Sequence, residues 1–225
     1  MPNFNSASSQ QNILDNILQV YPIPFWRLLL PLILQTGMIL AVIAPNLYTQ
    51  YTGKTIILQT TPQDPYDMLR GNYIALEYNI SRIETLKNLP GWSHLINQYP
   101  GIHQQYFPVA EGTKFYVILH QQSTSPTWKP LRVTSTLPTT LPENQVALRA
   151  SYRYGSIVYG LEKFELPQIE SDLNKDILRG RQIRLGQKQP IQVKIKVDSQ
   201  GNAVPMEMQV VDTSPDGKKF RIYEF

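Results

Sequence analysis

The hydrophobic pattern of the chain begins with one long apolar run near the N-terminus. From Leu28 to Pro45 the sequence carries no charged residue over 18 positions, and an uncharged apolar run of this length predicts a membrane-spanning helix. Extension to Phe25 and Tyr48 gives a helix that covers a hydrocarbon core of about 30 Å, at a rise of about 1.5 Å per residue. We therefore predict a transmembrane anchor over residues 25–48.

Two other interpretations of this run are a buried helix of a soluble core and a cleaved signal peptide. Val42 and Ala44 suit the small-residue pattern that precedes a cleavage site. However, the run is longer than the apolar region of a signal peptide, which has about 7–15 residues, and Pro45 would follow the cut. The pattern favours an uncleaved signal anchor with a single pass through the membrane.

Charged residues near the run set the expected orientation. Arg27 precedes the helix and Lys54 follows it at some distance, so the positive-inside rule favours a cytosolic N-terminus and an extracytoplasmic C-terminal domain. Residues 1–24 form an N-terminal tail, for which a disordered segment is one interpretation. The other is a short amphipathic helix on the membrane surface, indicated by the spacing of Ile13, Leu14, Ile17 and Leu18.

One face of the predicted helix carries small residues. Gly37, Ala41 and Ala44 stand at positions i, i+4 and i+7, and small residues on one face let a second helix approach closely in a membrane. We expect this face to pack against a helix of the same or another protein. The alternative is that these residues have no partner, since single-pass anchors often contain small residues.

After the anchor, apolar and polar residues alternate with the period of two that predicts half-buried strands. The pattern predicts about eight or nine strands, at residues 54–60, 73–80, 114–120, 128–134, 145–150, 156–159, 191–197, 203–211 and 219–225. Turn residues at 198–202 and at Asp216-Gly217 predict hairpins. Short helical turns are expected within residues 82–99 and after Pro167.

These elements predict a mainly β fold. We expect residues 49–225 to form a single β-sandwich or partly open barrel with one or two short helices. The hydrophobic fraction of 42% is sufficient for a core of this kind, and the net charge of +4 is too small to indicate a nucleic-acid partner. Because the chain has no cysteine, disulfides, thiolate nucleophiles and cysteine-ligated metals are excluded.

The most specific motif lies at the start of the second predicted strand. It consists of Gly71, Asn72, Tyr73, Leu76 and Tyr78. Glycine provides conformational freedom before the strand, and an asparagine side chain can close a turn. Within the strand, Leu76 and Tyr78 face the same side. The first interpretation of the motif is therefore structural.

A second block contains Tyr159, Gly160 and Glu162. Together the two blocks resemble the signature of the GDYxxLxY family, which are membrane-anchored bacterial proteins of uncharacterised function. Asn72 stands where the signature has aspartate, which fits a turn and not a catalytic base or metal ligand, since an amide carries no charge. The resemblance extends over most of residues 25–210 and implies an anchored domain. Members of this family are often linked with multi-span membrane proteins.

Basic residues gather in the C-terminal third of the chain. Between Asp176 and Asp198 no acidic residue occurs, and the basic ones are Arg179, Arg181, Arg184, Lys188, Lys194 and Lys196. With Arg70, the three arginines form a candidate binding rim for anionic headgroups or an acidic partner. The alternative is a solvated face, because the two last lysines alternate with apolar residues as in a half-buried strand.

No group of residues indicates catalysis. His94, His103 and His120 are scattered and lack the spacing of metal ligands. The segment Ser123–Thr127 loosely resembles the serine box of signal peptidases, but it follows the Arg70 segment instead of preceding it, and no lysine base accompanies it. We predict no catalytic, cofactor-binding or metal-binding residue, while an enzyme of unfamiliar type stays open.

The sequence therefore predicts a membrane-anchored, β-rich accessory or interaction domain. Its expected partners are the lipid bilayer and a multi-span membrane protein. The alternative is a module that binds an envelope ligand, such as a glycan or an anionic headgroup.

Overall fold

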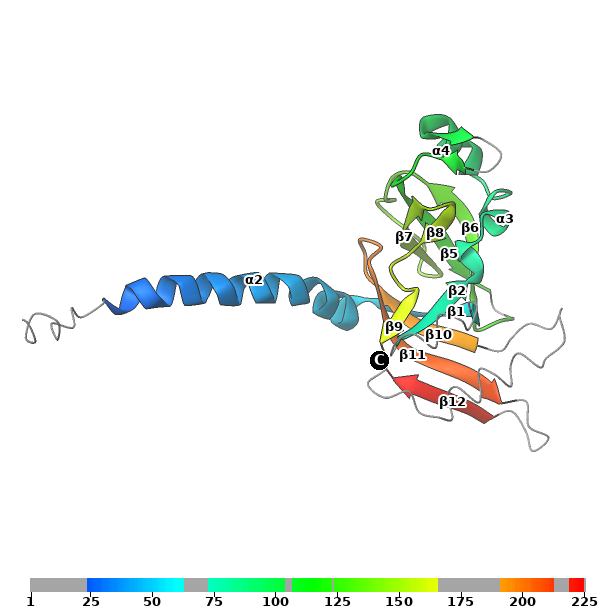
Figure 1. The fold of residues 1–225 in the computed structure, drawn as a ribbon. Coiled ribbons are helices and arrows are strands. Elements are labelled where there is room, and N and C mark those ends of the chain that lie inside the picture. Colours follow the sequence, from blue (N-terminus) through cyan, green and yellow to red (C-terminus); the bar gives the residue numbers. More distant parts are fainter. Residues whose placement is uncertain are drawn as a thin grey trace, which may run out of the picture. The chain divides into compact units, whose positions relative to one another are not determined.

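The computed structural model describes residues 24–62, 73–103, 107–122, 124–165, 191–212 and 219–224. The chain divides into two compact units, Met1–Pro45 and Asn46–Phe225. The first contains most of one long helix, and the second contains the end of that helix and the described strands (Figure 1).

Helix α2 (Phe25–Thr52) confirms the helix predicted over the apolar run and continues to Thr52, beyond its predicted end at Tyr48. Its 28 residues give a length of about 42 Å, which exceeds the thickness of a hydrocarbon core of about 30 Å. No residue of its most apolar 18-residue window is buried, unlike the core helix of a soluble protein. Within the described ranges, α2 alone is long and apolar enough to cross a membrane.

The first sheet of the second unit has six strands in the order β12-β11-β10-β1-β2-β9, paired antiparallel throughout. They are β1 (Lys54–Pro62), β2 (Tyr73–Tyr78), β9 (Lys163–Glu165), β10 (Ile191–Val197), β11 (Ala203–Asp212) and β12 (Lys219–Glu224). In β10, every second residue from Ile191 to Val197 is buried and those between are half-buried. The alternation in the sequence thus places one face of β10 on the core.

The second sheet has four antiparallel strands in the order β6-β5-β7-β8. They are β5 (Lys114–Gln121), β6 (Trp128–Thr134), β7 (Gln145–Arg153) and β8 (Ser156–Val158). The turn from β7 to β8 consists of Tyr154 and Gly155, with φ values of 50° and 75°. Positive φ at both central residues is what a two-residue type I′ hairpin requires.

Shorter elements connect the two sheets. After β2 the chain forms η1 (Asn79–Ser81), α3 (Ile83–Leu86) and α4 (Trp92–Gln98), followed by the two-stranded ribbon of β3 (Pro100–His103) and β4 (Phe107–Val109). Trp92 of α4 packs edge-on against Phe115 of β5, with ring centroids 6.4 Å apart. The helices therefore contribute to the core instead of lying free on the surface.

One hydrophobic core is shared by both large sheets. It includes Ile56 and Val193 from the six-stranded sheet and Phe115 and Leu148 from the four-stranded sheet, all at most 1% exposed. An isolated bridge between Ile57 and Thr127 also joins β1 to the chain just before β6. The predicted fold class is confirmed: the protein is mainly β with an N-terminal apolar helix and short helices.

Most predicted elements are present with small shifts of their ends. Strands β6 and β10 begin and end as predicted, the hairpin turn at 198–202 is present, and residues 82–99 contain α3 and α4. Strands β3, β4 and β9 were not predicted. The helix expected after Pro167, the Asp216-Gly217 turn and residues 1–23 lie outside the described residues.

Candidate functional site

The two sequence blocks that form the motif are neighbours in the fold. Strand β2 pairs antiparallel with β9, and in this register Tyr73 lies opposite Glu165 and Ala75 opposite Lys163 (Figure 1). The Leu76 N–H continues the contact by donating a hydrogen bond to the Glu162 carbonyl oxygen at 2.9 Å. Residues that are far apart in the sequence thus form one local structure.

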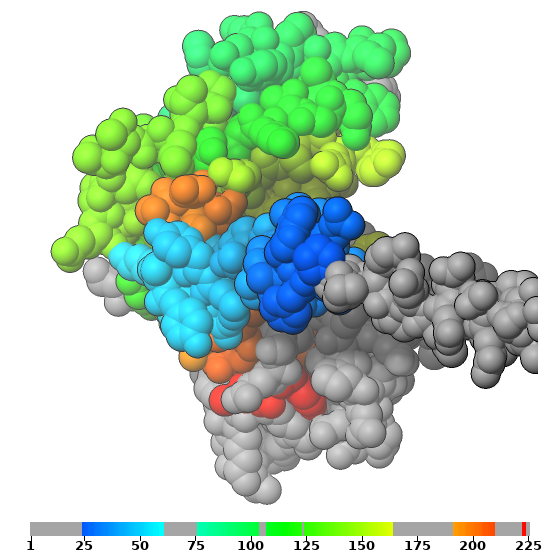
Figure 2. Space-filling model, turned by 90° about the vertical axis from the view of Figure 1, so that its left-hand side faces the viewer, coloured from blue at the N-terminus to red at the C-terminus, as the bar shows by residue number. Residues whose placement is uncertain are grey.

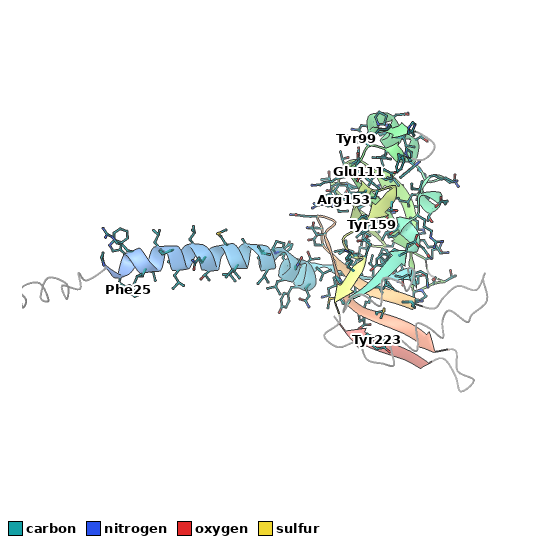
Figure 3. The ribbon with its side chains drawn as sticks, in the orientation of Figure 1. Phe25, Tyr99, Glu111, Arg153, Tyr159 and Tyr223 are labelled. Atoms are coloured by element: carbon teal, nitrogen blue, oxygen red, sulfur yellow. The ribbon has the colours of Figure 1, made fainter. Side chains whose placement is uncertain are left out.

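Two tyrosine hydroxyls join the chain around β2 to the second block, and each of these two segments supplies one of the donors. Tyr78, which is fully buried, donates to the Leu161 carbonyl oxygen at 2.9 Å. Tyr159, labelled in Figure 3, donates to the Ile80 carbonyl oxygen at 2.7 Å. Burial, and then the nearby Glu162 carboxylate, raise the pKa of both tyrosines well above the usual value. Both side chains therefore stay neutral and keep their donor hydrogens at physiological pH.

The second block is a tight turn. The Tyr159 N–H donates to the Glu162 carboxylate, and Gly160 between them has a φ of 80°, in the region that favours glycine. Glu162 thus accepts hydrogen bonds through both its side chain and its carbonyl oxygen. These contacts give Tyr159, Gly160 and Glu162 a role in holding the turn against β2.

A pocket of about 450 Å³ opens beside these two blocks. Its size lies within the usual range for small-ligand sites, about 300–1,000 Å³. Residues from β2 and η1, from β8, and from the turn before β9 line it: Leu76, Glu77, Ser81, Ser156, Ile157, Val158, Gly160, Glu162 and Lys163. Several residues of the motif therefore form the wall of a pocket.

Polar groups of the pocket differ in how well they are paired. The Glu77 carboxylate accepts from Arg82 at 3.1 and 3.3 Å, and Glu162 is paired as described above. In contrast, Ser81 is 8% exposed and its Oγ has no hydrogen-bond partner among the described residues. An unpaired buried hydroxyl costs free energy.

A second cluster of buried polar groups lies where α2 ends. Thr49 Oγ1 donates to Asp198 Oδ2 at 2.7 Å, and Asn202 Nδ2 donates to the same oxygen at 3.0 Å. Asp198 Oδ1 accepts from the N–H groups of Gln200 and Asn202, both at 2.9 Å. Figure 2 shows the segments around residues 50 and 200, in cyan and orange, side by side.

Thr49 and Asp198 are 1% and 7% exposed, so the charge of Asp198 lies away from water. Burial alone would raise the pKa of this carboxyl, but the hydrogen bonds from Asn202, Thr49 and Gln200 outweigh it and hold the pKa below its usual value. One residue, Gly53, separates α2, which ends at Thr52, from β1, which begins at Lys54.

The remaining residues predicted as functional lie on α2 or outside the described residues. Gly37, Ala41 and Ala44 lie on α2 and are exposed, and a Cβ placed on Gly37 would meet no atom within 4 Å. Arg70, Gly71, Asn72, Arg179, Arg181 and Arg184 lie outside the described residues. Sequence reasoning missed Ser81 and the pair of Thr49 and Asp198, which carry no motif.

In the described ranges, no three His, Cys, Asp or Glu side chains lie close enough to hold a metal ion. The Ser81 hydroxyl has no hydrogen-bonded base in the same ranges, whereas a serine nucleophile needs one.

A model of the GDYXXLXY protein family matches residues 35–208. Neither the curated proteins nor the solved structures contain a match to the chain. The family match begins inside α2 and ends in β11, so the region shared by the family includes part of the apolar helix and most of the β-rich unit, but not β12.

Proposed function

The chain belongs to the GDYXXLXY family, and on this premise we propose that it is a membrane-anchored accessory domain that binds another membrane protein. Helix α2 spans the bilayer as a signal anchor, with the N-terminus in the cytosol and the β-rich unit outside. Support for the span comes from the apolar surface of α2, and support for the orientation comes from Arg27 before the helix.

The observation that carries this proposal is the direct join between helix and sheet. Gly53 alone separates α2 from β1, and the last turn of α2 is held within the second unit by the bond from Thr49 to Asp198. The short connection between α2 and β1 keeps the β-rich unit close to the membrane surface. There its effective concentration toward a partner in the same membrane is high.

The small residues of α2 supply a second contact for the same partner. Gly37, Ala41 and Ala44 leave room for close approach of another helix, and close backbone approach is what drives helix association in lipid. The partner would thus be contacted both within the bilayer and outside it.

Cross-linking and capture of the tagged full-length protein from native membranes tests the proposal. We expect one multi-span protein in near-stoichiometric amount, and its loss when Gly37 and Ala41 are both changed to Leu. Ile39→Leu with Ile43→Leu is the matched control, because it has the same spacing on the opposite side of the helix. Recovery of the chain alone, or equal recovery with both double variants, contradicts the proposal.

Orientation can be measured separately, because the chain has no cysteine. A single cysteine at Ser199, which is exposed in the β10–β11 turn, should react with a membrane-impermeant maleimide in intact cells. A single cysteine at Ser9 should react only after lysis. The reverse pattern contradicts the proposed orientation.

A module that binds an envelope ligand is the second candidate, and the pocket of about 450 Å³ favours it. Two carboxylates and one ammonium group line the pocket, so a glycan fits its chemistry better than an anionic headgroup does. Binding of the full chain in lipid nanodiscs to a glycan array, with vesicles of anionic lipid for comparison, tests this function.

A further inference from the structure

A patch of large, exposed side chains lies where the β3–β4 ribbon meets the turn between β7 and β8. It consists of Tyr99, Ile102, Phe107 and Tyr154, which are 37%, 91%, 46% and 90% exposed. A Cβ placed on Gly155 would lie 3.3 Å from a ring carbon of Phe107, so the ribbon and the turn are neighbours. We call the four exposed residues the apolar patch.

Hydrogen bonds to the main chain hold the apolar patch in place. The Ala110 N–H donates to the Tyr99 carbonyl oxygen at 3.0 Å, and the Tyr154 N–H donates to the two carboxylate oxygens of Glu111 at 3.1 and 3.0 Å. Figure 3 labels Tyr99, Glu111 and Arg153 one below the other on the same side of the β-rich unit. The patch is therefore a fixed part of the fold.

Tyr154 occupies an unusual backbone position. Its φ is 50°, and in the described ranges no other residue besides glycine has a positive φ. A type I′ turn favours asparagine, aspartate or glycine at such a position, and a bulky side chain there is an outlier. The exposed ring gains no burial in exchange for this conformation, and strain that is retained in this way is typical of functional positions.

Two cations flank the apolar patch. Arg153 directly precedes the β7–β8 turn, and Lys114 of β5 lies opposite Ser151 of β7. Because side chains alternate along a strand, residues 151 and 153 share one face of β7, and Lys114 therefore lies on the same face as Arg153. Both cations are exposed, and neither has an ion pair within the described residues. Since Glu111 is already hydrogen-bonded to the turn, the surface beside the patch attracts anions.

The size and shape of the patch argue against a large protein interface. Weighted by their exposed fractions, the four side chains present roughly 500 Å², whereas a stable protein–protein interface covers about 800 Å² on each partner. Ile102 and Tyr154 are 91% and 90% exposed, so neighbouring side chains form no groove around them.

A lipid bilayer fits a surface with these properties. It requires no matching groove, because acyl chains adapt to each side chain that enters. Tyrosine suits the interface, since its ring contacts the acyl chains while its hydroxyl stays among the headgroups. Lysine and arginine beside apolar side chains attract anionic lipid.

We propose that the apolar patch inserts into the headgroup region of the bilayer, with Lys114 and Arg153 beside anionic lipid. This contact is a second one, in addition to the span of α2. Because Gly53 alone connects α2 to β1, the contact forms within a unit that is already tethered, and a few side chains suffice. The inference rests on the part of the proposed function in which α2 spans the bilayer, and it requires no protein partner.

A fluorescent label on a single cysteine tests the insertion, since the chain has no cysteine of its own. The full chain with Ile102→Cys carries an environment-sensitive dye and is reconstituted in vesicles of phosphatidylcholine and phosphatidylglycerol, with nitroxide-labelled lipid as quencher. Leu137→Cys is the matched control, because Leu137 is 36% exposed and lies in the loop between β6 and β7. We expect at least threefold stronger quenching at position 102, and equal quenching at both positions overturns the inference.

Variants of Tyr154 test the ring itself, with the label at position 102. Tyr154→Asn suits the positive φ and removes the ring, so it should lower the quenching at least twofold while the protein stays folded. Tyr154→Phe keeps the ring and should leave the quenching unchanged. Quenching that is the same in both variants contradicts insertion of Tyr154.

Charge variants test the lipid headgroup. Arg153→Gln with Lys114→Gln should remove the rise in quenching that phosphatidylglycerol causes at position 102. Lys129→Gln with Arg132→Gln is the matched control: it changes the charge equally on two exposed residues of β6, which β5 separates from β7. A rise that persists in the first pair, or that vanishes in both pairs, contradicts the role given to the two cations.

Three outcomes separate this inference from the proposed function. If alkaline carbonate extracts the chain from vesicles, α2 does not span the bilayer and both proposals fail. If the chain resists extraction but position 102 is not quenched, and a photo-cross-linker there captures a protein in native membranes, the patch is a protein surface and only this inference fails. If position 102 is quenched but no membrane protein is captured with the full chain, the proposed partner fails and the second membrane contact stands.

Discussion

The end of α2 and the pocket beside β8 both contain buried polar groups, but only the first pairs them all. At Asp198, two carboxylate oxygens accept four hydrogen bonds from Thr49, Gln200 and Asn202. At the pocket, Ser81 Oγ has no partner among the described residues. A cluster in which every polar group has a hydrogen-bond partner stabilises the fold. A cluster with an unpaired polar group can still accept a hydrogen bond from a ligand or donate one to it.

Removal of the Asp198 carboxylate should have the largest effect. Asp198→Ala leaves the Thr49 hydroxyl and two main-chain N–H groups without their acceptor, and we expect a loss of about 3 kcal/mol in the free energy of unfolding. Denaturant titration in detergent, followed by tryptophan fluorescence, measures it. A loss below about 1 kcal/mol would show that water replaces the carboxylate and that the cluster is not closed.

Tyr78→Phe tests the hydrogen bond that joins the two blocks of the motif. The change removes one hydroxyl and leaves the buried Leu161 carbonyl oxygen unpaired, so we expect a loss of about 1–2 kcal/mol. Tyr154→Phe is the control, because Tyr154 is 90% exposed and should change stability by less than about 0.5 kcal/mol. Equal effects of the two changes would contradict the structural role of Tyr78.

Strong acid should weaken the Asp198 cluster. The pKa of Asp198 is lowered in the folded protein, so its contribution is complete above the unfolded value of about 3.9 and is lost as the pH falls through the folded value. The stability difference between the wild type and Asp198→Asn should therefore be constant from about pH 5 to 8 and shrink below about pH 4. Unfolding midpoints at pH 7 and pH 3 measure it, and a difference that grows in acid would reverse the sign.

The smallest expected effect is a gain in the free energy of unfolding instead of a loss. Ser81→Ala removes a buried hydroxyl that has no partner in the described ranges, and we expect a gain of about 0.5 kcal/mol in stability without ligand. Thr49→Val deletes a paired hydroxyl at nearly constant volume and should cost about 1–2 kcal/mol. The comparison between the two clusters breaks down if both changes destabilise the protein equally.

The sequence predicts elements where alternation is strong. Strand β10 and its neighbour β11 show a clear period of two, and the turn between them contains Gly201 with a φ of 83°. Strands β3 and β4 lack this signal because they are short and contain Pro100, Gly101 and Pro108, which are typical of turns. Local pattern therefore identified the long strands and the short β8, and it missed the short strands β3, β4 and β9.

The candidate site was harder to predict because it depends on pairing. Tyr78 and Leu161 are 83 positions apart, and Thr49 and Asp198 are 149 positions apart. The resemblance to the family identified both blocks of the motif but did not indicate that they meet.

The position of β1 also determines the order in which the domain can be completed. Strand β1 lies between β2 and β10, and Lys54 at its start pairs with Val197 near the end of the chain. Since synthesis proceeds from the N-terminus, α2 and β1 exist long before β10, and pairs of such large sequence separation form slowly. During most of translation, the edge of β1 that pairs with β10 is therefore unpaired. Ile56 and Leu58 of β1, which are buried in the folded protein, are not yet covered. In this interval the nascent chain is most exposed to aggregation and in greatest need of a chaperone.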